Sequence, residues 1–177
     1  MKVRRVVTGH DVNGKAVFVS DEIAEPILHP FDPEFKIHWL WGRDDPAKFP
    51  DDGAEPAKTT FFPPLGGFRF CIITMPPPGS APASVDVAVA TRELELRLPG
   101  LARHLEADQP GMHTTATVDV EVVLAGEVGL ELDDGREVVL TAGDTVVQNG
   151  TRHRWHNRGS GPVVMAVITL GAHHANA

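Results

Sequence analysis

Apolar and polar residues alternate along most of the chain after residue 111. Alternation with a period of two is typical of β-strands that bury one face. Turn-forming sequences, such as Asp133-Asp134-Gly135 and Gly159-Ser160-Gly161-Pro162, separate the alternating runs. Short strands at this regular spacing predict an all-β sandwich or barrel. The predicted strands are residues 112–125, 127–132, 136–140, 144–148, 152–157 and 163–170.

The beginning of the chain predicts a β-hairpin. Arg4–Thr8 and Lys15–Ser20 are rich in β-branched residues, and Asn13-Gly14 lies between them. This dipeptide accepts the positive φ angles of a tight hairpin turn. We therefore expect two antiparallel strands within residues 1–20.

Most of the 15 prolines lie between Pro26 and Pro82, which excludes long helices from that part of the chain. A helix of one or two turns is predicted only at residues 101–107, because a Pro-Gly pair bounds that segment on each side. Residues 43–58 form an acidic loop, either a lid or a solvated connection. The further predicted strands are residues 36–41, 68–74 and 83–90.

The segment from Met112 to Leu124 carries two different faces. If it is extended, one face holds polar and ionisable residues and the other holds apolar ones. On alternation alone, a surface strand whose polar side meets water is the favoured interpretation. The alternative is a polar row that lines the inside of a barrel. The polar face comprises His113, Thr115, Thr117, Asp119 and Glu121.

Composition narrows the possible partners. The 177 residues suit one structural domain, and the net charge of −8, without a long basic run, argues against nucleic acid. Cys71 is the single cysteine, so no intrachain disulfide forms, and a small buried hydrophobe is its expected role. No apolar run is long enough to span a bilayer, and no apolar leader follows the N-terminus. These features predict a cytoplasmic protein without a membrane partner.

Two phrases, Gly111–Gly126 and Gly143–Asn157, resemble the two sequence motifs of the cupin superfamily. His113 takes the place of the first motif histidine, and Asp119 replaces the motif glutamate. Thr115 stands where the second histidine belongs. His153 matches the histidine of the second motif, and Gln148 stands at its usual proline.

The resemblance implies a double-stranded β-helix, or jelly-roll, barrel over residues 67–171, similar to the small single-domain cupins of the conserved-barrel type. Residues 1–66 would add strands and Pro-rich loops to this barrel, residues 172–177 would form a tail, and at most one short helix is expected. Residues 79–112 resemble an insertion ahead of the first motif. Cupin barrels expose apolar sheet faces, so a homodimer is expected. Its candidate contacts are Val7, Phe18, Trp39 and Trp41.

The resemblance also implies that the polar row faces the barrel interior. Two histidines and an acid are suitable ligands for a divalent transition metal, namely Fe, Mn, Ni, Zn or Cu. His113, Asp119 and His153 are the predicted metal ligands. Glu121 is the predicted catalytic residue, with a fourth ligand as its alternative role. The predicted substrate-binding residues are Thr115, Gln148 and Trp155, and core packing is an equal alternative for Trp155.

Two classes of function remain open. The first is a small-molecule enzyme that combines a metal with proton transfer, as an isomerase, cyclase, decarboxylase or lyase acting on an oxygenated substrate; a metal-dependent dioxygenase is its variant. The second is a metal-free module that binds or senses a small molecule. The chain has no tyrosine, so a proton donor must be His, Asp, Glu or metal-bound water. The enzyme is favoured, because inward carboxylates are costly to bury unless they are paired, protonated or bound to metal.

Overall fold

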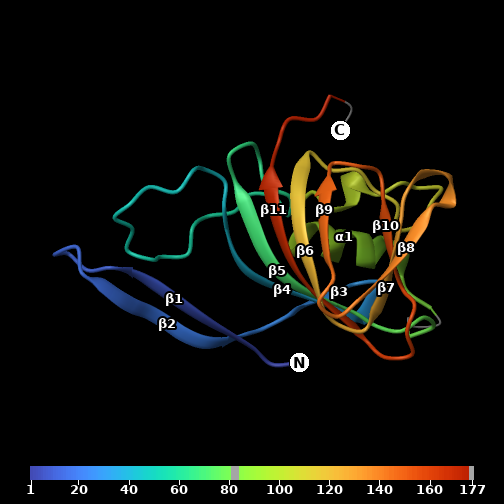
Figure 1. Cartoon of the computed structure of the whole chain (residues 1–177), viewed down its shortest axis with the longest axis horizontal. Coiled ribbons are helices and arrows are strands. Elements are labelled where there is room, and N and C mark those ends of the chain that lie inside the picture. Colours follow the sequence, from blue (N-terminus) through green and yellow to red (C-terminus); the bar gives the residue numbers. More distant parts are fainter. Residues whose placement is uncertain (81–83, 176–177) are drawn as a thin grey trace.

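A computed structural model describes residues 1–80 and 84–175 of the chain. These residues form eleven strands, one α-helix and two short 3-10 helices (Figure 1). The helix α1 spans Val87–Arg97, and the 3-10 turns span Ala102–His104 and Asp133–Gly135. The strands are β1 Val3–His10, β2 Ala16–Ala24, β3 Ile27–His29, β4 Asp32–Arg43, β5 Phe68–Met75, β6 Thr117–Ala125, β7 Glu127–Glu131, β8 Glu137–Thr141, β9 Thr145–Asn149, β10 Arg154–Asn157 and β11 Val163–Gly171.

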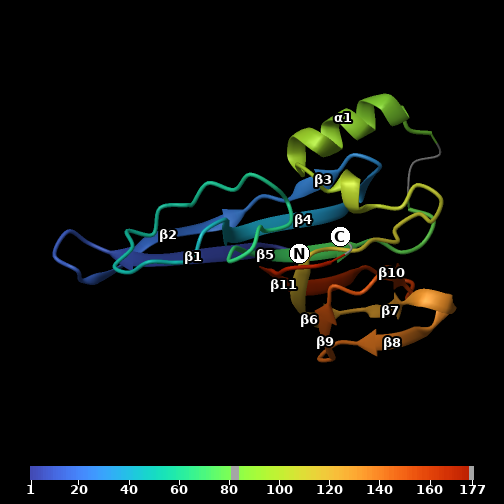
Figure 2. The same cartoon turned by 90° about the horizontal axis from the view of Figure 1, so that it is seen from above.

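The strands form two facing sheets and a separate hairpin (Figure 2). The larger sheet has six strands in the order β3-β4-β5-β11-β6-β9, and the smaller has three in the order β10-β7-β8. An apolar core that includes Val123, Val128 and Met165 lies between the two sheets. All six strands predicted after residue 111 are present, although the first begins at Thr117 rather than residue 112. The predicted all-β, double-stranded β-helix fold with one short helix is confirmed.

The hairpin and the helix cover opposite faces of the larger sheet. Val3 of β1 packs with Leu40, Ile72 and Val164. Leu94 and Leu98 of the α1 region pack instead in the cluster that contains Cys71. Since Cys71 and Ile72 are neighbours in β5, their side chains point to opposite faces. The helix therefore closes the inner side of the sheet, and the hairpin lies outside.

The predicted N-terminal hairpin is present but forms a sheet of its own rather than extending either larger sheet. Its turn is held by Asp11, whose side chain accepts hydrogen bonds from the backbone N–H groups of Asn13 and Lys15. Gly14 has a φ of 78°, as the turn requires. The hairpin projects beyond the barrel (Figures 1 and 2).

The strand predicted at residues 83–90 is wrong, because α1 begins at Val87; residue 83 itself lies outside the described residues. The alternating valines of this segment indicated a strand. Three buried side chains spaced four residues apart, Ala90, Leu94 and Leu98, favour a helix instead. Asp86 caps it by accepting a hydrogen bond from the Val89 N–H. The helix predicted at residues 101–107 is only a short 3-10 turn. In the described part of the chain, no helix is long and apolar enough to cross a membrane.

Candidate functional site in the barrel interior

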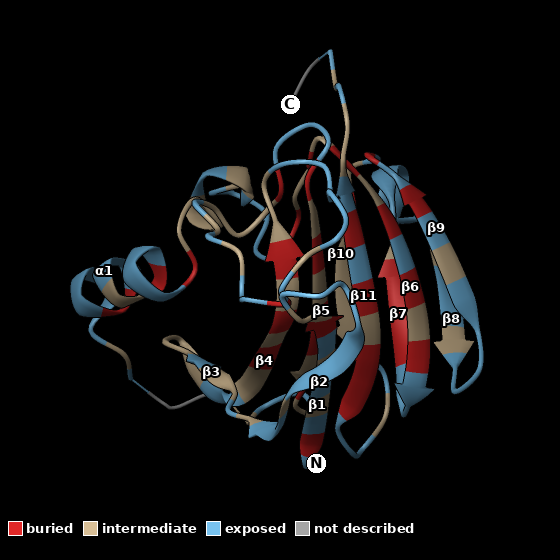
Figure 3. Ribbon diagram, turned by 90° about the vertical axis from the view of Figure 1, so that its left-hand side faces the viewer, coloured by how far each residue is buried: buried red, intermediate tan, exposed pale blue. Residues whose placement is uncertain are grey.

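The polar row of β6 faces the inside of the barrel. Asp119 and Glu121 are each 4% exposed, whereas Val120 between them is 38% exposed. Burial alternates in this way along β6 and β11 (Figure 3). The shared face predicted for this row is confirmed, and the interpretation as a surface strand is wrong. Val120 and Leu124, on the opposite, apolar row, are exposed.

Cross-strand neighbours extend the polar row over three strands. Asp119 lies between Thr169 of β11 and Gln148 of β9 in the sheet register. All three side chains are buried. The Gln148 amide donates to Thr151, two residues before His153, so it also supports the turn that carries this histidine. The Thr169 hydroxyl has no hydrogen-bond partner. Thr169 was missed by the sequence reasoning, because only the strand order reveals its position.

Asp119 and Glu121 are buried with incomplete hydrogen bonding. Oδ1 of Asp119 and Oε2 of Glu121 are buried and have no partner. Burial raises the pKa of Asp119 to about 6, and a hydrogen bond from Thr117 partly opposes this. Burial, with a smaller effect of the nearby Asp119 charge, raises the pKa of Glu121 to about 8. Near neutral pH the row therefore presents one carboxyl in its protonated form beside one in its ionised form.

His113, which precedes β6, and His153, which precedes β10, lie side by side. Their backbones exchange two N–H···O=C hydrogen bonds of 2.9 Å, and their ring centroids are 4.2 Å apart. The turn before His153 favours glycine at residue 150. The φ of Gly150 is 59°, and an added Cβ would lie 3.1 Å from the Thr115 carbonyl oxygen.

Both imidazoles have the protonation state of metal ligands. Nδ1 of His113 lies 2.9 Å from the Gly111 carbonyl oxygen, and Nδ1 of His153 lies 2.8 Å from that of Thr151. Because a carbonyl only accepts, Nδ1 carries the proton in each ring and Nε2 keeps the lone pair. Burial lowers the pKa of both side chains, that of His153 to about 4. Each imidazole is therefore neutral at physiological pH.

The predicted three-residue metal set is only partly assembled. Among the described residues, the donor atoms of His113, Asp119 and His153 do not all lie within 4.8 Å of one another. The histidine pair is brought together, and its chemistry fits a divalent transition metal. Coordination by Asp119 stays a prediction. The Thr115 hydroxyl lies 2.8 Å from the Thr117 hydroxyl and continues the polar row toward the histidines.

Aromatic rings line the approach to the histidine pair. Trp155 meets His153 edge-on at 6.1 Å and packs on the core between the sheets, so core packing is confirmed and substrate binding stays a prediction. Phe62 stacks on His113 at 6.5 Å and meets His104 edge-on at 5.0 Å. Phe62 is a neighbour of His113 that the sequence reasoning missed. The apolar pair Phe61-Phe62 near the acidic loop was the only local signal.

The acidic loop itself contacts the hairpin. The His10 N–H donates to the Asp51 carbonyl at 2.8 Å, and Gly9 lies against the backbone of Asp52. These contacts favour the connection over the lid, since they hold the loop outside the barrel.

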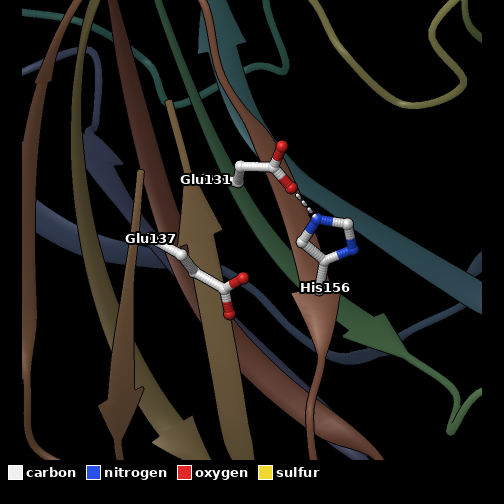
Figure 4. Close-up of side chains that lie close together, drawn as sticks. All are labelled: Glu131, Glu137 and His156. Carbon is white, nitrogen blue, oxygen red and sulfur yellow. Dashed lines mark hydrogen bonds and ion pairs between the residues drawn. The ribbon is translucent and has the colours of Figure 1, made fainter. Parts of the chain in front are cut away.

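A second ionisable cluster, Glu131, Glu137 and His156, lies on the smaller sheet (Figure 4). Its donor atoms lie within 4.8 Å of one another, as a metal site requires. Arg154 already donates two hydrogen bonds to Glu131, of 2.9 and 2.8 Å, and His156 contacts the same carboxylate at 2.6 Å. Hydrogen bonds from Arg154 and then His156 lower the pKa of Glu131 to about 2.

Glu137 of this cluster is paired with Arg158. Two arginines thus balance two carboxylates, and a cation would have to displace them. We therefore interpret the cluster as an ion-pair network.

The chain is similar to several known proteins. Residues 106–169 match the family model described as Cupin domain. Over 47 residues the chain is 51% identical to Phomopsin biosynthesis cluster protein C' of Diaporthe leptostromiformis, which covers 27% of this chain and 25% of that protein. It is 24% identical over 171 residues to the Cupin-domain-containing oxidoreductase srdB of Neurospora crassa, which covers 94% of this chain and 71% of that protein. The Schizosaccharomyces pombe Cnp3 cupin domain matches with a TM-score of 0.49 at 9% identity, over 97% of this chain and 89% of that domain.

The fold and the interior row define a β-barrel protein with a buried polar site. Residues 106–169 are a cupin domain, as the two motifs predicted. The match spans about a quarter of the length of the Phomopsin cluster protein. The barrel sheet also includes β3 and β4, which precede the segment that matches the family model.

Proposed function

We propose that this cupin is an enzyme that acts on a small oxygenated molecule bound against the inward row of β6. The observation that carries the proposal is the pair of buried carboxyl groups, Asp119 and Glu121, with unpaired oxygen atoms. Such groups are costly to bury, so their position favours contact with a molecule or ion that is not part of the chain. Their raised pKa values suit proton transfer near neutral pH.

His113 and His153 are the proposed holders of a divalent transition metal, and Asp119 is the proposed third ligand. The neutral imidazoles with Nε2 lone pairs support this assignment. When bound, such an ion polarises a carbonyl or enol oxygen of the substrate. Its identity among Fe, Mn, Ni, Zn and Cu stays open.

Glu121 is the proposed proton-transfer residue. It is protonated near neutral pH, because its pKa is about 8, and it gives up this proton once the reaction places a stronger base beside it. Ionised Glu121 then takes a proton from the substrate. Thr115, Gln148 and Trp155 are the proposed substrate contacts around this exchange. Isomerisation, cyclisation, decarboxylation and elimination all fit such a two-way proton transfer.

Oxygen-dependent chemistry is the second candidate among enzymes. It is favoured by the name of the Neurospora crassa relative, a cupin-domain-containing oxidoreductase. A metal-free binding or sensing cupin is the candidate without catalysis, and Thr115 at the place of the second motif histidine favours it. A cytoplasmic location and a homodimer also remain proposals.

Metal content separates these candidates. The protein is purified without chelator, and metal is measured by mass spectrometry in the wild type and in His113→Ala and His153→Ala. We expect one equivalent in the wild type and a large loss in both variants. The matched control is His156→Ala, which removes an imidazole on the opposite face and should leave the content unchanged. Equal metal content in all four proteins would reject the proposed site and favour the metal-free binding module.

A further inference from the structure

The two histidines of the site belong to a small piece of sheet that three separate segments of the chain build. Leu105 forms an antiparallel bridge with His113, and His113 forms another with His153. The Glu106 N–H also donates to the Met112 carbonyl oxygen at 2.9 Å. These bridges are isolated contacts outside the strands, so a side-chain bond between the segments has a large influence on how they are spaced.

The side chain of Arg152 joins the first and third of these segments. Its Nε and Nη2 atoms donate to the two carboxylate oxygens of Glu106, each at 2.6 Å. Its Nη1 atom donates to Asp133, in the turn between β7 and β8, at 2.8 Å. Two parallel bonds from a guanidinium to a carboxylate fix direction as well as distance. One side chain thus ties three segments together around the histidine pair.

This ion pair is better shielded from water than an ordinary surface pair. The side chains of Arg152 and Glu106 are 27% and 31% exposed, whereas those of Arg4 and Asp21 in the hairpin are 65% and 51% exposed. Exposed pairs contribute little to stability, because water screens them and the side chains lose entropy. A bidentate, partly buried pair is the arrangement that does hold two segments in place.

Arg152 itself stays out of the polar row. Neighbouring side chains of an extended segment point to opposite faces. His153 is 2% exposed, and the Arg152 side chain beside it reaches Asp133, whose side chain is 69% exposed. Arg152 therefore influences the site through the backbone and not by contact with a bound molecule.

We propose that Arg152 and Glu106 form a clamp that sets the spacing of the His113 and His153 imidazoles and so raises the affinity of this pair for a divalent metal. The metal part rests on the proposed function. Arg152 and Glu106 are positioning residues, because each is joined to the backbone on one side of the histidine pair. Residues that orient metal ligands from outside typically change metal affinity by roughly 10- to 100-fold.

Amide hydrogen exchange of the full, metal-free chain, followed by NMR, tests the clamp without any metal. The reporters are the amides of His113 and His153, which donate to each other's carbonyl groups. Arg152→Ala should speed their exchange by roughly tenfold or more, while the amides that join β6 and β11 keep their wild-type rates. Glu106→Ala should act in the same direction. The double variant should exchange no faster than Arg152→Ala, because the two residues form one interaction.

The matched control is Arg158→Ala. Arg158 also donates two hydrogen bonds to one carboxylate, that of Glu137. Glu137 lies on β8, and Arg158 follows the end of β10 that is far from His153. This variant loses an ion pair of the same kind on the same sheet, and it should leave the exchange of both histidine amides unchanged.

Zinc binding, measured in competition with a chromogenic chelator, is the second readout. Arg152→Ala should bind Zn²⁺ roughly 10- to 100-fold more weakly than the wild type, and Arg158→Ala should bind it equally well. A wild type that binds no zinc would reject the metal part, and the exchange rates alone would then decide on the clamp. Equal zinc affinity in Arg152→Ala and the wild type would overturn the effect on metal binding.

Three exchange results would overturn the clamp itself. The first is an unchanged rate at both histidine amides in Arg152→Ala. The second is an equal rise at the amides between β6 and β11, since this marks a loss of overall stability. The third is an equal rise at the histidine amides in Arg158→Ala.

Discussion

Glu121 makes the stability of the metal-free protein depend on pH, and Glu121→Gln should remove that dependence. Burial raises the pKa of this carboxyl to about 8 from the ordinary 4.5. The unfolded chain therefore releases the proton at a lower pH than the folded chain. Stability from this group is fully present below about pH 4.5 and is lost as pH rises toward about 8.

The size of the effect follows from the two pKa values. At 1.36 kcal/mol per pKa unit, the difference corresponds to about 5 kcal/mol as an upper limit. Each kcal/mol shifts the midpoint of a chain of this size by about 2 to 4 °C. We therefore expect Glu121→Gln to melt above the wild type at pH 8 by up to about 10 to 20 °C, with the gap closing toward pH 5.

Melting curves by circular dichroism from pH 5 to pH 9, after chelator treatment, measure this gap. The control is Glu127→Gln, an exposed glutamate on β7, whose melting should follow the wild type at every pH. Adding the metal that binds best should narrow the gap, since a nearby cation stabilises the ionised carboxylates. A gap that is constant with pH, or a wild type that is more stable at pH 8, would refute the reasoning.

Three further predictions concern the site and its support. Once a substrate is known, Glu121→Gln should keep its metal while turnover falls by roughly a hundredfold or more; loss of the metal instead would make Glu121 a ligand. Thr115→His should bind metal more tightly than the wild type in competition with a chromogenic chelator, because it adds an imidazole to the row. Leu98→Ala, at a residue with 0% exposure, should lower the free energy of unfolding in urea by roughly 2 to 5 kcal/mol, and Leu96→Ala should change it little.

The sequence predicted the polar row well, because a period of two within one strand is a local signal. His113 and His153 were also predicted as partners, although only through the family resemblance. Their tautomers depend on the carbonyls of Gly111 and Thr151, and these contacts follow from the local turns. The sequence could not predict whether the Asp119 carboxylate lies close enough to the two imidazoles to share one ion with them, since this depends on distances between a strand and two loops.

Features that depend on contacts between distant segments could not be predicted from the sequence. Valines in the α1 segment indicated a strand, and the helix became clear only from the apolar cluster that it covers. Phe62 contacts His113 although the two residues are far apart in the sequence, so no local spacing pattern could have identified it. Exposure of Val120 was missed for the same reason: alternation separates two faces but does not say which one another element covers.

The position of β11 has a consequence for how the protein is made. This last strand, Val163–Gly171, lies between β5 and β6 and supplies the hydrogen bonds that join them. During synthesis β5 and β6 must each wait, with one unpaired edge, until β11 has left the ribosome. Long-range pairing of this kind is slow and leaves edges that can join other chains. Yield in the cell should therefore depend on chaperones that hold the nascent chain until β11 arrives.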